Sequence, residues 1–192
     1  MTREQVVVLG AGPGGLAVAA ALGERGVQAL VVDRATDVGS SWRNHYERLR
    51  LHTPRRRSGP PGYPIPRRYG RWVARGDVVR YLEEYVDHHG IRLRLGTAVT
   101  RVERGPDPAS PDDTARWVVR LADDTTTAAD HVVVATGYNH TAVTPAWPGL
   151  DGFTGDLVLA RDYRNGRPFA GRDVLVVGTG NTGTEIATDL AE

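Results

Sequence analysis

The sequence contains no cysteine among its 192 residues, and this absence excludes several kinds of chemistry. Without a thiol the chain forms no disulfide, offers no thiolate nucleophile and binds no metal through cysteine. Lysine is absent as well, because all 24 basic residues are arginine, so no lysine can form a Schiff base with a substrate. No group of histidines and acids has the spacing of a metal site, and we expect no bound metal.

Long apolar runs and a strong net charge are also missing. No apolar stretch approaches the ~18 residues that a membrane-spanning helix needs. A net charge of +1 gives no overall attraction to nucleic acid or to an anionic membrane, so we expect neither as a partner. The first predicted strand begins within a few residues of Met1, so we expect no signal peptide and a cytoplasmic protein.

A glycine-rich loop follows the first apolar run of the chain. Residues 6–9 are continuously apolar, as in a strand buried on both faces, and the G-x-G-x-x-G pattern of residues 10–15 follows directly. In this pattern Gly10 permits a tight turn, Gly12 lets the backbone approach a pyrophosphate, and Gly15 lets the next helix pack closely on the strand. The loop therefore predicts a dinucleotide site; the alternative is a glycine-rich surface turn.

The sequence after this loop strengthens the first interpretation. A helix is predicted over residues 16–22, ending near Gly26, and its N-terminal amides would face the phosphates. A second apolar run, residues 27–32, ends in Asp33, at about the 20-residue offset where an acid accepts hydrogen bonds from a ribose 2′-hydroxyl. A carboxylate there would repel a 2′-phosphate, so the first site suits FAD or NAD and not NADP.

The same loop occurs a second time, close to the end of the chain. Residues 174–177 form an apolar run that predicts a strand, and Gly178, Gly180 and Gly183 repeat the glycine spacing before a helix-like stretch. Two such loops predict two dinucleotides. We expect one complete binding domain over residues 1–149, a linker over 150–172, and the truncated start of a second domain over 173–192.

The central part of the chain predicts mixed secondary structure. Aromatic residues indicate that the proline-rich segment 35–76 is ordered, and a helix is predicted from an N-cap at Asp77 to Gly90. Short strands are predicted over 91–95, 97–102, 117–121 and 128–134, with a surface turn over 105–114. The predicted fold class is α/β: a three-layer Rossmann-like domain with a parallel sheet and a β meander, leading into a second Rossmann domain.

Three further motifs occur in a recognisable order. An apolar strand runs into Ala135-Thr136-Gly137, the sequence G-S-S-W-R fills residues 39–43, and F-T-G fills 153–155. With the two glycine loops, the chain from Gln5 to Glu192 resembles the N-terminal half of a class B flavin-containing monooxygenase, a family that includes plant indole-pyruvate monooxygenases and Baeyer–Villiger-type enzymes.

The resemblance implies a mechanism and its cofactors. In such enzymes NADPH reduces FAD, and the reduced flavin reacts with O₂ to form a C4a-(hydro)peroxide that oxygenates a small organic substrate. NADH stays open as an alternative to NADPH. The resemblance also implies that the FAD domain is discontinuous, its last strand and helix returning after the NADPH domain.

The resemblance also assigns residues, although it assigns no catalytic side chain. It implies FAD contacts at Gly10, Gly12, Gly14, Gly15, Asp33, Arg34, Trp42, Arg43, His52, Val99, Ala135, Thr136 and Gly137, and NADPH contacts at Gly178, Gly180, Asn181 and Gly183. Asp33 stands where the family usually has Glu. Leu159 stands where the fingerprint F-x-G-x-x-x-H-x-x-x-(W/Y) has His, and Leu can neither hydrogen-bond nor titrate.

Other interpretations remain open at this point. The chain could belong to a non-oxygenating NAD(P)H flavin oxidoreductase or be a catalytically inactive FAD-binding fragment, whereas a disulfide reductase would need the cysteine pair that is absent. Trp42 could be a core residue or a cofactor contact. The arginine runs 55–57 and 67–68 could meet cofactor phosphates, although solvated charge is the commoner role.

Overall fold

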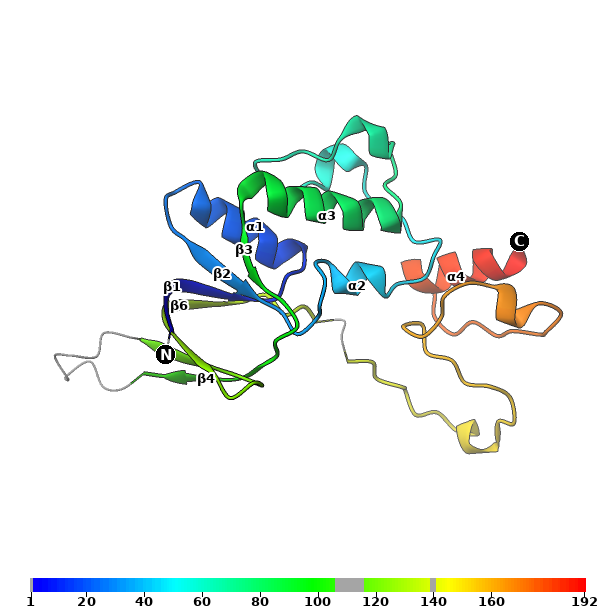
Figure 1. The fold of residues 1–192 in the computed structure, drawn as a ribbon. Coiled ribbons are helices and arrows are strands. Elements are labelled where there is room, and N and C mark those ends of the chain that lie inside the picture. The colour runs from blue at the N-terminus through cyan, green and yellow to red at the C-terminus, as the bar shows by residue number, and fades with distance from the viewer. Residues whose placement is uncertain (1, 106–115, 139–140) are drawn as a thin grey trace.

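A computed structural model describes residues 2–105, 116–138 and 141–192, and its centre is a six-stranded sheet in the order β3-β2-β1-β6-β5-β4 (Figure 1). The strands are β1 (Thr2–Leu9), β2 (Ala29–Val32), β3 (Arg92–Arg94), β4 (Val99–Arg104), β5 (Trp117–Leu121) and β6 (Thr126–Val134). The first three and β6 run parallel, while β4, β5 and β6 form an antiparallel meander. The surface turn expected over 105–114 lies, beyond Gly105, outside the described residues.

The central parallel strands are buried on both faces, β1 over residues 6–9 and β2 over most of its length. The helices α1 (Pro13–Gly23) and α3 (Arg75–His89) cover one face of the sheet (Figure 1). Val6 and Val8 face this side, where they pack with Ala19 of α1. Val7 and Leu9 alternate with them and face the opposite side, where Val119 of β5 packs against them. Helices thus cover one face of the central strands, and β5 of the same sheet packs against the other, which confirms the predicted α/β fold class.

Helix boundaries differ slightly from the prediction. Asp77 is not the N-cap of α3, because the helix begins two residues earlier and Ala74 occupies the cap position. Asp77 lies instead in the first turn, where a carboxylate interacts favourably with the helix dipole. Gly90 does end the helix, in the left-handed conformation with φ of 59° that favours glycine. The earlier helix α1 ends at Gly23, before Gly26.

The proline-rich segment is ordered, as predicted. It contains the short helix α2 (Ser40–Arg43) and the 3-10 turns η1 (Arg55–Arg57) and η2 (Arg67–Tyr69). Residues 49–51 run beside residues 73–75, because Leu51 donates a backbone hydrogen bond to Val73 at 2.8 Å and Arg75 donates one to Leu49, also at 2.8 Å. Tyr69 and Val73 are buried in the core, which anchors the segment on α3.

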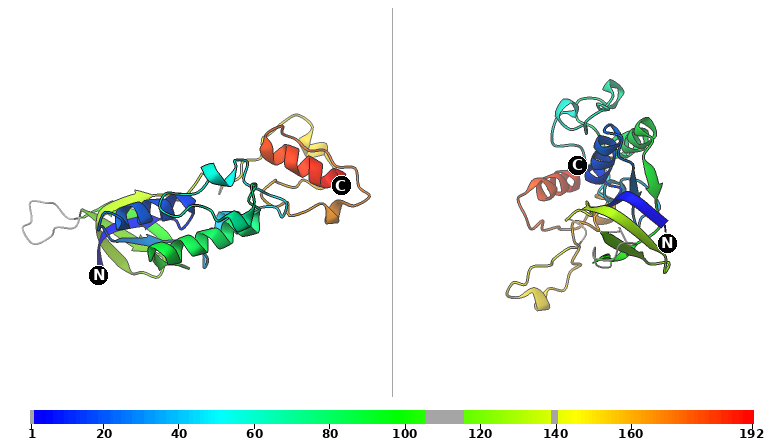
Figure 2. Two further views of the ribbon diagram at one scale, coloured as in Figure 1. Left: turned by 90° about the horizontal axis from the view of Figure 1, so that it is seen from above. Right: turned by 90° about the vertical axis from the view of Figure 1, so that its left-hand side faces the viewer.

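The C-terminal part packs against the segment around Tyr46 through its C-terminal helix and through Tyr163. After the exposed residues 141–149 come the 3-10 turns η3 (Leu150–Gly152) and η4 (Arg167–Phe169) and the helix α4 (Asn181–Ala191), which lies far from the N-terminus (Figure 2). Ile186 of α4 is buried with Tyr46, Leu49 and Tyr163.

The strand predicted over residues 174–177 is not formed. These residues pair with no strand in the described part of the chain, and Leu175 is 87% exposed. An apolar run of this kind needs neighbouring strands to supply its hydrogen bonds and its cover. The prediction of a strand at residues 174–177 was therefore wrong, although the helix predicted after the second glycine loop is present as α4.

Candidate dinucleotide sites

The first glycine loop has the close-packed geometry that its sequence predicts. Gly10 has φ of 114°, and a Cβ built on it would lie 2.4 Å from the Ala135 carbonyl oxygen. A Cβ on Gly15 would lie 1.9 Å from the Gly10 carbonyl oxygen, so any side chain there would break the loop. Gly12 differs, because a Cβ there would meet nothing within 4 Å. Two glycines are thus required by the protein itself, and the third faces open space at the N-terminus of α1.

Asp33 lies beside this loop. One of its carboxylate oxygens accepts a hydrogen bond from the Ala11 amide at 2.6 Å, and the other accepts one from the Ala35 amide at 2.8 Å. Ala135 donates a backbone hydrogen bond to Leu9 at 2.9 Å, which brings the end of β6 to the same edge of the sheet. The glycine loop, the acid and residues 135–137 therefore meet where parallel strands end, the usual place for a ligand in an open α/β sheet.

Most of the other predicted FAD contacts surround this edge. Gly39 donates a backbone hydrogen bond to the Ala11 carbonyl at 3.0 Å, which places α2 against the loop. Val99 begins β4 shortly after Thr97, whose amide donates to the Asp33 carbonyl at 2.9 Å. Predicted contacts that face solvent here are Gly14, Arg34, Thr136 and Gly137.

Trp42 and Arg43 are engaged within the protein. Trp42 is half-buried and packs against both the α3 core and the cluster that holds α4. Arg43 donates from Nε to the Val38 carbonyl at 3.2 Å, and its guanidinium forms an ion pair with Glu83 of α3. Both residues therefore have a structural role in holding α2, next to the predicted cofactor site.

The second glycine loop has the same shape as the first. Gly178 has φ of 129°, and a Cβ on Gly183 would lie 2.1 Å from the Gly178 carbonyl oxygen. Gly180 has φ of −75° and ψ of 177°, close to the −83° and 177° of Gly12. A Cβ on Gly180 would likewise meet nothing within 4 Å. This loop opens α4 as the first opens α1.

His52 lies at the second loop. Its Nδ1 is 2.9 Å from the side-chain nitrogen of Asn181, and its Nε2 is 3.1 Å from an oxygen of Glu185. The other oxygen of Glu185 accepts a hydrogen bond from the Tyr46 hydroxyl at 2.5 Å. Burial and the neighbouring Glu185 carboxylate raise the pKa of Tyr46, so its hydroxyl remains a donor.

Tyr46 and Glu185 were not identified from the sequence as residues of this site. Glu185 follows Asn181 by four residues on α4, so it lies one helical turn along the same face. That spacing was a signal available in the sequence. Nothing local in the sequence indicates that Tyr46, 139 residues earlier, contacts Glu185.

Leu159 lies in a turn that does not depend on its side chain. Its carbonyl oxygen accepts hydrogen bonds from the Asp162 and Tyr163 amides, at 2.8 and 3.2 Å. Tyr163 is buried and donates through its hydroxyl to Asp189 of α4 at 2.5 Å. The aromatic end of the fingerprint is thus structural, whereas Phe153 at its start is 59% exposed.

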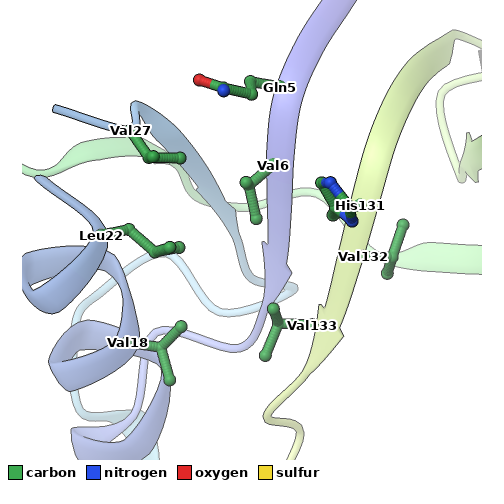
Figure 3. A pocket seen from close by; sticks show the side chains of 8 residues that line it. All are labelled: Gln5, Val6, Val18, Leu22, Val27, His131, Val132 and Val133. Carbon is green, nitrogen blue, oxygen red and sulfur yellow. The ribbon is translucent and has the colours of Figure 1, made fainter. Parts of the chain in front are cut away.

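An apolar groove of about 450 Å³ lies away from both glycine loops (Figure 3). Val18 and Leu22 extend from α1 toward Val6 of β1 and Val133 of β6. Its complete lining is Gln5, Val6, Val18, Leu22, Val27, His131, Val132 and Val133. The groove offers few groups that could bind a phosphate or a sugar, so it is not a candidate cofactor site.

One edge of β6 is open near this groove. β5 pairs with β6 only over residues 126–129, and the described residues supply no partner on that side for residues 130–134. Among the helices that the structure describes, none is long and apolar enough to cross a membrane.

The two loops, the sheet order and the acid after β2 define an α/β protein of the Rossmann-type dinucleotide-binding class. Comparison with known families is more specific. The chain belongs to the flavin-binding monooxygenase-like family, whose model matches residues 3–192.

Known relatives agree with this assignment. Indole-3-pyruvate monooxygenase YUCCA1 of Oryza sativa subsp. japonica is 40% identical over 185 residues, which are 96% of this chain and 44% of that protein. The flavin-containing monooxygenase structure from Stenotrophomonas maltophilia matches with a TM-score of 0.89 and 29% identity, over 100% of this chain and 56% of that one. The bacillithiol disulfide reductase from Staphylococcus aureus, at 19% identity and a TM-score of 0.81 over 99% of this chain and 54% of that one, shares the fold alone. The chain thus spans about half the length of these relatives.

Proposed function

We propose that this chain is the FAD-binding part, with the start of the NADPH-binding part, of a flavin-dependent monooxygenase. The proposed domains are residues 1–149 for FAD, 150–172 as a linker, and 173–192 as the beginning of the NADPH unit. The family assignment and the names of the relatives support this proposal. When bound, FAD would carry electrons from NADPH to O₂ and supply the oxygen-transfer chemistry.

The observation that carries the proposal is the open space at Gly12. Gly10 and Gly15 leave no room for a side chain, whereas a Cβ on Gly12, directly before α1, would lie in open space. Helix N-termini bind phosphate groups through their free amides. We expect the FAD pyrophosphate to lie in this open space and Asp33, which accepts a hydrogen bond from the loop residue Ala11, to bind the ribose.

The same argument assigns the second loop to NADPH, with NADH as the alternative. A Cβ on Gly180 would likewise lie in open space, directly before Asn181 at the N-terminus of α4. The proposed reaction uses O₂ and a small organic substrate. Indole-3-pyruvate, the substrate in the name of the rice relative, is the first compound to test.

Leu159 favours a second candidate, an NAD(P)H flavin oxidoreductase that releases hydrogen peroxide in place of oxygenated product. The family resemblance places a histidine at this position, and leucine supplies no hydrogen bond. The ratio of oxygenated product to hydrogen peroxide distinguishes the two candidates.

The direct test is flavin content. The whole polypeptide that the gene encodes should purify yellow, and the released cofactor should be FAD. Gly12→Val should remove the colour, because its side chain would occupy the pyrophosphate space, without lowering the melting temperature of the protein. Gly23→Val is the matched control, since Gly23 also has open space but lies at the other end of α1. Colourless wild-type protein that also fails to bind added FAD would overturn the proposal.

A further inference from the structure

A single imidazole connects the two glycine-loop units. His52 belongs to the segment that packs beside the first site, while its two ring nitrogens contact Asn181 and Glu185, both on α4. The distances are 2.9 Å to the Asn181 amide nitrogen and 3.1 Å to the Glu185 carboxylate. The residues that meet here are 129 and 133 positions apart in the chain.

The chemistry of these contacts is consistent with one neutral histidine. The Asn181 amide nitrogen can only donate, so Nδ1 of His52 must accept. Nε2 then carries the proton and donates a hydrogen bond to the Glu185 carboxylate, which can only accept one. Both ring nitrogens are satisfied at once, and the ring orientation is fixed by its two partners.

These contacts hold the helix at its first turn. Asn181 is the first residue of α4, directly after Gly180, and Glu185 lies one turn further on. The second Glu185 oxygen is held by Tyr46, which is only 1% exposed and therefore rigidly placed. The second glycine loop is thus attached at two successive points to the segment beside the first loop.

We propose that His52 is a positioning residue that sets the second glycine loop relative to the first, and with it the position of NAD(P)H relative to the flavin. The inference rests on the proposed function, because it assumes a dinucleotide at each loop. His52 does this through Asn181 and Glu185, with Tyr46 fixing the far side of the carboxylate.

The test uses variants of the whole polypeptide that the gene encodes. His52→Ala and Tyr46→Phe should each raise KM for NADPH about tenfold, the usual effect of losing a hydrogen bond to a charged group, and slow flavin reduction by NADPH. His52→Gln, which can keep one of the two contacts, should lie between wild type and His52→Ala. Tyr163→Phe is the matched control, because Tyr163 is also buried and also donates to a carboxylate of α4, but two turns from the loop.

A second readout does not depend on activity. Amide hydrogen exchange over residues 178–184 should accelerate in His52→Ala and Tyr46→Phe and stay unchanged in Tyr163→Phe. If Tyr163→Phe changes KM and this exchange as much as the other two, or if none of the three changes them, the positioning role is wrong. A wild-type enzyme whose flavin NADPH does not reduce would instead overturn the proposed function, and the exchange data would still decide the role of His52 in holding the loop.

Discussion

Among single residues, Leu159 bears most directly on the chemistry. Its backbone, and not its side chain, forms the turn that leads to Tyr163, so Leu159→His should preserve the fold. If the family's histidine stabilises the oxygenating complex by one hydrogen bond of roughly 1 kcal/mol, the product-to-peroxide ratio should rise about fivefold. The measurement is NADPH consumption, product and peroxide in the whole polypeptide. Val158→His, at the exposed neighbouring position, is the control. An unchanged or lower ratio would show that this position has no part in coupling.

His45 predicts how stability depends on pH. Burial lowers the pKa of His45 below its ordinary value of 6.5, and Arg164 and Arg75 lower it further. Between the two pKa values the unfolded chain binds a proton that the folded protein does not, so stability should fall as pH drops below about 6.5 and level off below the folded pKa. Melting temperatures of His45→Gln should fall less steeply over this range than those of wild type. The exposed His131→Gln serves as control. Parallel curves for wild type and His45→Gln would contradict the assignment.

The glycines of the first loop show how much could be predicted from the sequence for single residues. The separate roles of Gly10, Gly12 and Gly15 follow from their spacing alone, and the structure reproduces the close approaches at the first and last of them. The contact between Tyr46 and Glu185 could not be predicted, because it depends on how two distant segments pack. Local spacing encodes local backbone geometry, whereas such contacts require the complete fold.

At the scale of elements, α4 depends on its packing. It has 11 residues, and an isolated helix of that length is marginal in water. Ile186 is its buried residue, so Ile186→Ala should cost about 2–4 kcal/mol and loosen α4 without unfolding the sheet. Hydrogen exchange should therefore accelerate in α4 and stay unchanged in α3. Thr188→Ala, on the exposed side of α4, is the control. Equal acceleration in α3 would show that the two regions unfold together.

Elements were predicted well where a pattern was local. The strands of the sheet follow from apolar runs and alternation, and Gly90 marks the end of α3 through its left-handed conformation. The prediction of a strand over residues 174–177 was wrong because an apolar run forms a strand only beside other strands. The start of α3 was predicted too late in the sequence, at an N-cap at Asp77, because an acid suits the first turn of a helix as well as its cap.

At the scale of the whole molecule, the 192-residue chain alone should show no NADPH-dependent O₂ consumption. Residues 174–177 are largely exposed, and the described residues leave one edge of β6 open over 130–134. The proposed NADPH site has a loop and a helix but no described sheet beneath them. Oxygen uptake with added FAD and NADPH measures this directly, with free FAD as the reference. A rate well above that reference would overturn the proposed domain division.

Limited proteolysis tests the same division physically. Residues 141–149 and 151–158 are exposed, so a protease should cut there first and leave the core of residues 5–137 intact. The released C-terminal piece should remain bound for a time, because α4 is held through Ile186 and Tyr163. Early cleavage inside the sheet would contradict this order.

The second glycine loop has its shape although no sheet lies under residues 174–177. The geometry of this loop therefore does not require residues 174–177 to form a strand in a sheet. We therefore expect residues 178–191 to keep this loop shape after a different preceding segment, as long as α4 keeps its packing against Tyr46 and Tyr163.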